Sequence, residues 1–186
     1  MIKSKHNFNK TKSDLRIFIQ QRLLPSENQL DVMPSFLAFT CNGTAKGHVV
    51  YANFGREEDF KLLSDRGVSV KGHIALVRQG KLFRGNKVKY ATENGAIGII
   101  IYNDPSEFAP DGPNNTYPYK WWLPKTGIQR GAAAYDVSPG DVLTPGYPSI
   151  DGIYRIPLNE VKKPGIPAHD ISYEDAYEIL RRLKGS

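Results

Sequence analysis

The stretch of residues 72–104 places the strongest constraint on how this chain can fold. It contains two short apolar runs, His73–Arg78 and Ile97–Tyr102, separated by a segment with helical character, Asn86–Asn94. Apolar runs of this length predict strands, and a run that is apolar throughout is typical of a strand covered on both faces. Gly95 stands where a left-handed residue commonly ends a helix. Two parallel strands joined by one helix form a right-handed crossover, so the sequence predicts an α/β fold with a βαβ unit.

Weaker patterns on both sides of this stretch extend the prediction. Apolar runs predict two further strands, each followed by a helical pattern: Gly47–Phe54 before Arg56–Arg66, and Ile166–Ile171 before Tyr173–Leu183. Ser172 and Asp175 form a capping box at the start of the last helix, and Gly67 ends the first. Residues 15–24 are ambiguous between strand and helix, residues 25–42 suggest an extended lead-in, and residues 104–131 are irregular. We therefore expect a small central mixed sheet with a βαβ crossover and flanking helices.

The length of 186 residues corresponds to one domain with a core of ordinary size. The formal net charge of +6 is concentrated at the N-terminus, because residues 1–22 contain six Lys or Arg and one Asp. We therefore divide the chain into a basic flanking segment, 1–23, and a nearly neutral domain, 24–186. No aromatic platform or basic groove accompanies the basic segment, so we interpret it as solvated and expect no nucleic-acid partner.

Cysteine content and glycosylation motifs bear on where the protein works. Cys41 is the only cysteine, which excludes an intrachain disulfide and a cysteine metal cage. The longest apolar run is too short to span a bilayer, and the N-terminus lacks the apolar core of a signal peptide. Three N-x-S/T motifs, at Asn9, Asn42 and Asn114, favour an extracellular or lumenal location. The targeting signal would then lie outside this chain.

Catalytic signatures are absent from the sequence. The four histidines, His6, His48, His73 and His169, show no metal-ligand spacing. Three of them lie in or beside predicted strands, where a structural role is more common than metal binding. Neither a G-x-S-x-G elbow nor a phosphate-binding glycine loop occurs, and Cys41 has no local signature of a nucleophile. From its own residues, the chain is not expected to be an enzyme.

Two features indicate binding instead. Arg84 follows the first strand of the crossover, in a turn at the carboxyl edge of the predicted sheet, where open α/β sheets bind ligands. Its planar guanidinium could hold a carboxylate, although the pattern alone fits a solvated arginine better. Tyr117–Trp122 lies in a long loop rich in proline and aromatic residues. These aromatic side chains could anchor a partner or cover the core of the domain itself, and the sequence leaves both alternatives open.

Several longer strings resemble a known family. YANFGREEDF, GKLFRGNKVKYATENGAIGIIIYNDP, WWLP, QRG and LTPGYPS occur in the order found in the protease-associated (PA) domain of the glutamate carboxypeptidase II family. That family includes NAALADase-like peptidases, the folate hydrolase called prostate-specific membrane antigen and, more distantly, the transferrin receptor. The closing string IPAHDISYEDAYEILRRLKG resembles the end of the domain, so the resemblance covers about residues 24–186. The FRGNK and QRG strings resemble the peptidase side of the family.

The resemblance implies a PA-type domain that covers the active-site cleft of a zinc metallopeptidase. The zinc ions and the catalytic glutamate belong to the family's peptidase domain, which this chain lacks, so the chain alone should hold no cofactor and hydrolyse no peptide. Arg84 matches the arginine that helps to hold the substrate's terminal carboxylate, and Ala132 replaces the asparagine that assists it. Thr144 and Tyr147 match positions whose backbone carbonyls complete a calcium site. Calcium takes six to eight oxygens, several from carboxylates, so this half-site should bind no calcium alone.

Two functions follow as alternatives. In the first, the chain is the substrate-covering PA (apical) domain of a glutamate-carboxypeptidase-like enzyme in the ectodomain of a membrane-anchored protein. Its partners would be the peptidase and dimerisation domains of the same chain and peptides with an acidic C-terminus. In the second, it is a free-standing PA-type module that binds a protein or peptide through Tyr117–Trp122. A peptidase region encoded beyond Ser186 would favour the first.

Overall fold

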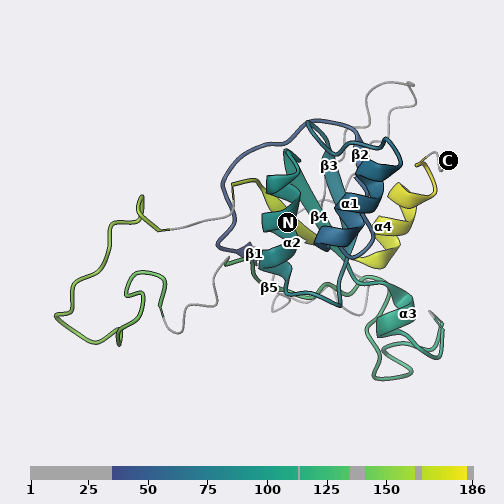
Figure 1. The fold of residues 1–186 in the computed structure, drawn as a ribbon. Helices are drawn as coiled ribbons and strands as arrows, with labels where there is room; N and C mark the ends of the chain where they lie inside the picture. The colour runs from purple at the N-terminus through teal and green to yellow at the C-terminus, as the bar shows by residue number, and fades with distance from the viewer. Residues whose placement is uncertain (1–34, 113, 135–140, 162–164, 184–186) are drawn as a thin grey trace.

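Four parallel strands form the central sheet, in the order β2-β3-β4-β6 (Figure 1). The structure, a computed structural model, describes residues 35–112, 114–134, 141–161 and 165–183. The strands of this sheet are β2 (Val49–Tyr51), β3 (Ile74–Arg78), β4 (Gly98–Tyr102) and β6 (Ala168–Ile171). A second parallel sheet pairs two short strands, β1 (Leu37–Ala38) and β5 (Gly131–Ala132). Strand β1 contacts β6, so the small sheet lies beside the edge of the large one.

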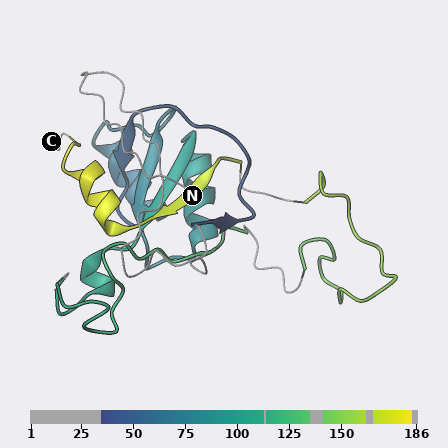
Figure 2. The same cartoon turned by 180° about the vertical axis from the view of Figure 1, so that it is seen from behind.

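Four helices connect and cover the strands. They are α1 (Glu57–Asp65), α2 (Arg84–Glu93), α3 (Pro105–Phe108) and α4 (Tyr173–Leu180). Helices α1 and α2 cover one face of the central sheet and α4 covers the other (Figure 2). The sheet thus lies between two separate hydrophobic cores, one under α1 and α2 and the other under α4.

Strands β3 and β4 form the centre of the sheet because nearly every side chain on them is apolar and buried. Ala75 and Val77 face the core under α1 and α2, together with Ile99 and Ile101 of β4. The alternate residues of both strands, such as Leu76, face the core under α4. This two-sided burial confirms the interpretation of the apolar runs as fully covered strands.

The predicted ends of the helices are confirmed at three positions. Gly67 and Gly95 have positive φ angles of 73° and 79°, the left-handed conformation that ends α1 and α2 at low cost. The Ser172 hydroxyl accepts a hydrogen bond from the Asp175 amide at 3.1 Å and so caps α4. These local features set the chain direction where α1 and α2 end and where α4 begins.

The α/β class and the βαβ crossover, formed by β3, α2 and β4, are confirmed, but the central sheet is not mixed. All three of its strand pairs are parallel. The physical reason lies in the connections. Parallel neighbours need a crossover, and here α1, α2 or a long segment separates each pair, whereas an antiparallel pair could be joined by a short hairpin turn.

The strands are shorter than predicted, and two strands were missed. Strand β2 covers only three residues of the predicted run Gly47–Phe54 because Asn53 takes a positive φ of 49° and turns the chain away. Strands β1 and β5 have two residues each, too few for any hydrophobic period. Residues 15–24 lie outside the described residues.

Two segments extend away from the layered body. Residues 141–161 form a projecting arm, drawn in green, and α3 with the segment after it lies below the carboxyl edge of the sheet (Figure 1). None of the helices formed by the described residues has the length and apolar character that a bilayer span requires.

Candidate functional site

Buried polar side chains gather at the carboxyl edge of the central sheet. Gln79 follows β3, Asn103 follows β4, and Asp170 and Ser172 lie at the end of β6, and none of the four is more than 5% exposed. Burying such groups costs free energy unless they are bonded, so a cluster of them at one edge calls for an explanation. The edge is also where open α/β sheets bind ligands, which makes it the candidate site.

Arg84 lies at this edge, but it is the first residue of α2 rather than part of the preceding turn. The prediction that Arg84 lies in the turn and that the helix begins at Asn86 was wrong, because the helix begins two residues earlier. Phe83 acts as the N-cap with an extended backbone and makes no side-chain hydrogen bond to the helix. A helix start of this kind carries none of the Ser, Thr, Asp or Asn signals from which a start can be predicted.

The Arg84 guanidinium is held in one orientation by a neutral partner. With the Gln79 amide turned so that its oxygen faces Arg84, that oxygen accepts from Nε at 3.3 Å and from Nη2 at 3.2 Å. On its other side the guanidinium lies against the backbone of Gly131, where an added methyl group would overlap Nη1 and lie 2.6 Å from Cζ. Gly131 therefore makes room for the close approach of this flexible side chain, and its backbone angle is ordinary.

A second glycine fixes the helix that carries Arg84. A methyl group added to Gly85 would overlap the carbonyl oxygen of Ala134, so α2 can begin this close to the chain after β5 only with glycine there. The glycines of the FRGNK and QRG strings thus serve one contact, in which the start of α2 packs on β5. This reason for the two glycines is not visible in the strings themselves.

Ala132 follows Gly131 in β5 and is partly exposed. It lies next to the backbone that Arg84 touches, and the expectation that a residue here assists the arginine stays a prediction. A methyl side chain offers no hydrogen bond. The role of Arg84 in binding a substrate stays a prediction.

Asp170 is the most unusual group of the edge. It is 2% exposed, and neither carboxylate oxygen has a hydrogen-bond partner among the described residues. Burial raises the pKa of the Asp170 carboxyl to about 7, although the positive charge of Arg84 acts in the opposite direction. No sequence pattern points to this residue, because a single Asp at the end of a short strand is ordinary.

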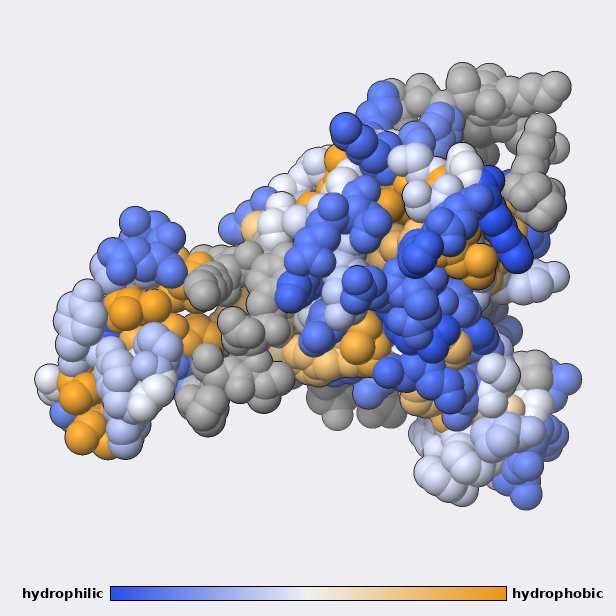
Figure 3. Space-filling model, in the orientation of Figure 1, coloured by the Kyte–Doolittle hydropathy of each residue, from blue (hydrophilic) through white to orange (hydrophobic). Residues whose placement is uncertain are grey.

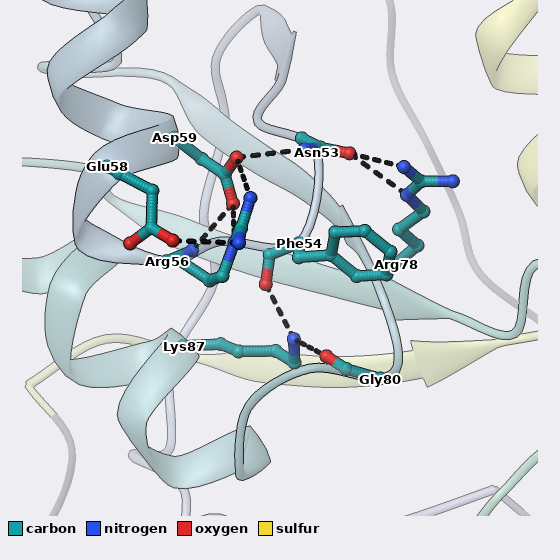
Figure 4. Close-up of polar contacts among 8 residues, drawn as sticks. All are labelled: Asn53, Phe54, Arg56, Glu58, Asp59, Arg78, Gly80 and Lys87. Atoms are coloured by element: carbon teal, nitrogen blue, oxygen red, sulfur yellow. Dashed lines mark hydrogen bonds and ion pairs between the residues drawn. The ribbon is translucent and has the colours of Figure 1, made fainter.

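A buried lysine supports the turn that leads into Arg84 (Figure 4). Lys87 is completely buried, and its Nζ donates to the carbonyl oxygens of Phe54 at 2.5 Å and Gly80 at 2.8 Å. These carbonyls belong to the loops that follow β2 and β3. Burial lowers the pKa of Lys87 from 10.5 to about 8. The ammonium group therefore links two loops and the helix that begins with Arg84.

Two arginines and a carboxylate complete the network around Phe54 (Figure 4). The Arg78 guanidinium stacks 3.9 Å from the Phe54 ring centroid and donates to the Asn53 side-chain oxygen at 2.7 and 3.0 Å. Asn53 in turn donates to Asp59 at 2.8 Å, and Arg56 donates to the same carboxylate. Burial alone would raise the pKa of Asp59, but these hydrogen bonds outweigh it and lower that pKa. The network fixes the geometry of the loops after β2 and β3.

The aromatic segment, Tyr117–Trp122, is largely exposed. Tyr119 is 85% and Trp121 80% exposed, so these two side chains do not cover the core of the domain. The rings of Trp121 and Trp122 stack 3.9 Å apart, and Trp122 Nε1 donates to Asp111 at 3.1 Å. Next to them lies a hollow of about 440 Å³, lined by Glu107, Phe108, Tyr117, Trp121, Trp122, Leu123 and Pro124.

The predicted calcium half-site lies in the projecting arm. The Thr144 carbonyl accepts a hydrogen bond from the Tyr147 amide at 3.2 Å, and Thr144 itself is completely buried. Asp141, a carboxylate of the same arm, already accepts from Leu143 and Ser149. Two carbonyls fit only part of a calcium shell, so the half-site stays a prediction for the complete protein.

Among the described residues, no group of three or more His, Cys, Asp or Glu side chains is placed to hold a metal ion. The rings of His48 and His73 meet edge to face at 5.5 Å, and burial lowers the pKa of His169. His6 lies outside the described residues.

These features define a small parallel α/β domain with a polar carboxyl edge, a projecting arm and an exposed aromatic segment. The chain belongs to the PA domain family, because the family model for the PA domain matches residues 38–135, more than half of the chain. The resemblance found in the sequence strings is thus confirmed.

Three relatives with different names each match most of this chain. The Glutamate carboxypeptidase 2 homolog of Caenorhabditis elegans is 43% identical over 157 residues, covering 81% of this chain and 20% of that protein. Aminopeptidase NAALADL1 of Rattus norvegicus is 39% identical over 171 residues, covering 90% and 23%. Transferrin receptor protein 2 of Mus musculus is 36% identical over 168 residues, covering 89% and 19%. The chain spans about a fifth of the length of these relatives.

A double-mutant cycle tests the fit between Arg84 and Gly131. Gly131→Ala should destabilise the domain by about 1 kcal/mol, the lower end of the range for overpacking, because its methyl group must displace the end of the flexible Arg84 side chain. In an Arg84→Ala background the same change should cost less than about 0.5 kcal/mol, since the obstacle is gone. Unfolding in urea measures both. Gly85→Ala is the control, because its obstacle is the Ala134 carbonyl and should cost the same in both backgrounds. Equal costs of Gly131→Ala in the two backgrounds would contradict the contact.

The buried ammonium of Lys87 predicts a pH dependence of stability. Its pKa in the folded protein, about 8, lies below the usual 10.5, so between these values the unfolded chain binds more protons. Stability should therefore rise with pH across this window, by about 3 kcal/mol relative to a Lys87→Met variant. Lys89→Met removes an exposed lysine of the same helix, so its free energy of unfolding should change with pH in parallel with that of the wild type. Parallel curves for wild type and Lys87→Met would show that the ammonium is not desolvated.

Proposed function

We propose that this chain is the substrate-covering PA domain of a glutamate-carboxypeptidase-like zinc metallopeptidase, without catalytic activity of its own. It contributes recognition of the substrate's terminal carboxylate through Arg84. The peptidase and dimerisation domains of the same protein are its partners, and the zinc and calcium ions belong to that complete protein. The match to relatives named as a glutamate carboxypeptidase homolog and an aminopeptidase supports this proposal.

The orientation of Arg84 is the observation that carries the proposal. Its guanidinium is held between Gln79 and Gly131, and none of the ion pairs found among the described residues includes it. A positive charge that is held rigidly but lacks an ion pair is suited to an incoming anion. The planar fork of an arginine matches the two oxygens of a carboxylate, which a lysine cannot reproduce.

The projecting arm supports contacts with another domain. Ile150, Tyr154 and Leu158 are each more than 60% exposed there, and Figure 3 shows apolar residues gathered on the arm. Apolar side chains exposed together on an extended segment commonly mark an interaction surface. Covering by the peptidase domain would bury them and bring carboxylates to the carbonyls of Thr144 and Tyr147.

An extracellular or lumenal location is part of the same proposal. Of the three glycosylation motifs, Asn42 and Asn114 are exposed, as a glycan requires, and Asn9 lies outside the described residues.

Kinetics of Arg84 variants in the complete protein test the proposal. A charge-assisted contact to a carboxylate contributes about 1.5–3 kcal/mol, so Arg84→Ala should lower kcat/KM by about 10- to 150-fold. Arg84→Lys should recover little, because it lacks the bidentate geometry. Since Ala132 offers no amide beside it, Arg84 should carry most of this recognition. Arg66→Ala, an exposed arginine after α1, is the control. If both Arg84 variants stay within about twofold of the parent, Arg84 is a surface arginine and the site assignment fails.

A second candidate function is a free-standing module that binds a peptide through the aromatic segment. The exposure of Tyr119 and Trp121 beside a hollow favours it, because exposed aromatic residues are common anchors of interfaces. Peptides selected from a displayed library against this chain should then lose at least about tenfold in affinity on Trp121→Ala. They should bind normally to Tyr177→Ala, which removes an exposed aromatic of α4. Equal loss in both variants, or none, would argue against this function.

A further inference from the structure

The buried carboxylate of Asp170 and the guanidinium of Arg84 share one end of the sheet. In the register of β4 and β6, Asp170 pairs with Ile101, which faces the core under α1 and α2. Paired residues on neighbouring strands point to the same face, so Asp170 points toward the side that α2 covers. Arg84 begins α2 and lies on Gly131 of β5, and β5 pairs with β1, the strand next to β6.

The surroundings of Asp170 leave its carboxylate without an alternative partner. The side chain is almost fully buried, and its two oxygens accept no hydrogen bond from the described residues. Only its backbone is tied, since its carbonyl accepts from the Ser35 hydroxyl at 2.9 Å. A buried carboxylate in this situation either becomes neutral or depends on a nearby cation.

We propose that Asp170 is a positioning residue for Arg84 and makes its binding of carboxylates depend on pH. As a carboxylate, Asp170 competes for the guanidinium and partly neutralises it. As a neutral acid, it leaves the guanidinium to the incoming carboxylate. The inference rests on the proposed function of Arg84 and adds the condition under which that function operates.

The charged groups around Asp170 are few. Strand β1 has no titratable side chain, and on β4 only Tyr102 could titrate, but it faces the opposite core under α4. On α2, Arg84 is the described cation whose charge lowers the pKa of Asp170, against the larger effect of burial. Lys87, on the same helix, donates its hydrogen bonds to two carbonyl oxygens in the loops after β2 and β3. His169 precedes Asp170 in β6, so its side chain points to the other face.

The first measurement follows the Asp170 carboxyl carbon by NMR while pH is varied, in this chain and in its Arg84→Met variant. Removing a nearby cation should raise the pKa of Asp170 by about one pH unit. Lys89→Met removes an exposed cation of the same helix and should leave it unchanged. If the pKa of Asp170 is the same in Arg84→Met as in the wild type, the two groups are not coupled. The inference is then overturned, whatever Arg84 binds.

The second measurement is the affinity for N-acetylglutamate, a probe whose carboxylates are ionised at both pH 6 and pH 8. Wild type should bind about fivefold more tightly at pH 6 than at pH 8. Asp170→Asn and the apolar Asp170→Leu should keep the tighter binding at both values. The histidines and the other titratable groups common to all variants contribute equally to the pH dependence of affinity, so their contributions cancel in this comparison. A pH dependence that persists in both Asp170 variants would overturn the inference.

The two proposals fail in different ways. If Arg84→Met binds the probe as tightly as wild type does, the proposed role of Arg84 fails. The NMR titration would still decide whether Asp170 and Arg84 are coupled, because it requires no ligand.

Discussion

The geometry of the polar carboxyl edge depends on the two hydrogen bonds that the Lys87 ammonium donates. Its two hydrogen bonds join the loop after β2 to the loop after β3, through the carbonyls of Phe54 and Gly80. Both acceptors are backbone groups, so the contact fixes the path of the chain rather than the rotamer of a side chain. The turn that follows Gly80 leads directly into α2, and the position of Arg84 therefore follows from where Lys87 holds that turn.

Burying the charged groups of this network costs desolvation free energy, so each of them needs hydrogen-bond partners. An unpaired buried ammonium or carboxylate would be strongly destabilising, so each charge here is bonded to more than one group. Lys87 has two carbonyls, and Asp59 accepts from Arg56 and Asn53. Hydrogen bonds have narrow geometry, so a network of this kind allows fewer loop conformations than apolar packing does. Asp170 is the exception, because its carboxylate lacks such partners among the described residues.

The sequence predicted the parts of the fold that local periodicity controls. The buried runs of β3 and β4, the helix between them and the left-handed Gly95 were all found, because burial on both faces and a helix end leave local patterns. The parallel direction of β6 and the pairing of β1 with β5 depend on contacts distant in sequence, and two-residue strands carry no period. Arg84 was singled out from its place after a strand and from the family resemblance, and its role in binding stays a prediction. The close approach at Gly131 was not predicted, because it arises from a side chain 47 positions away in the sequence.

The first turns of α1 and α2 carry opposite charges, which bears on the proposed role of Arg84. Three acidic residues, Glu57 to Asp59, occupy the first turn of α1, where they complement the positive end of the helix dipole. The first turn of α2 has no acidic residue and begins with Arg84, so like charges add there. That arrangement costs helix stability, and an incoming carboxylate would relieve it. In the absence of a ligand, the Asp170 carboxylate would provide the same relief, which joins the burial of Asp170 and the charge of Arg84 in one electrostatic balance.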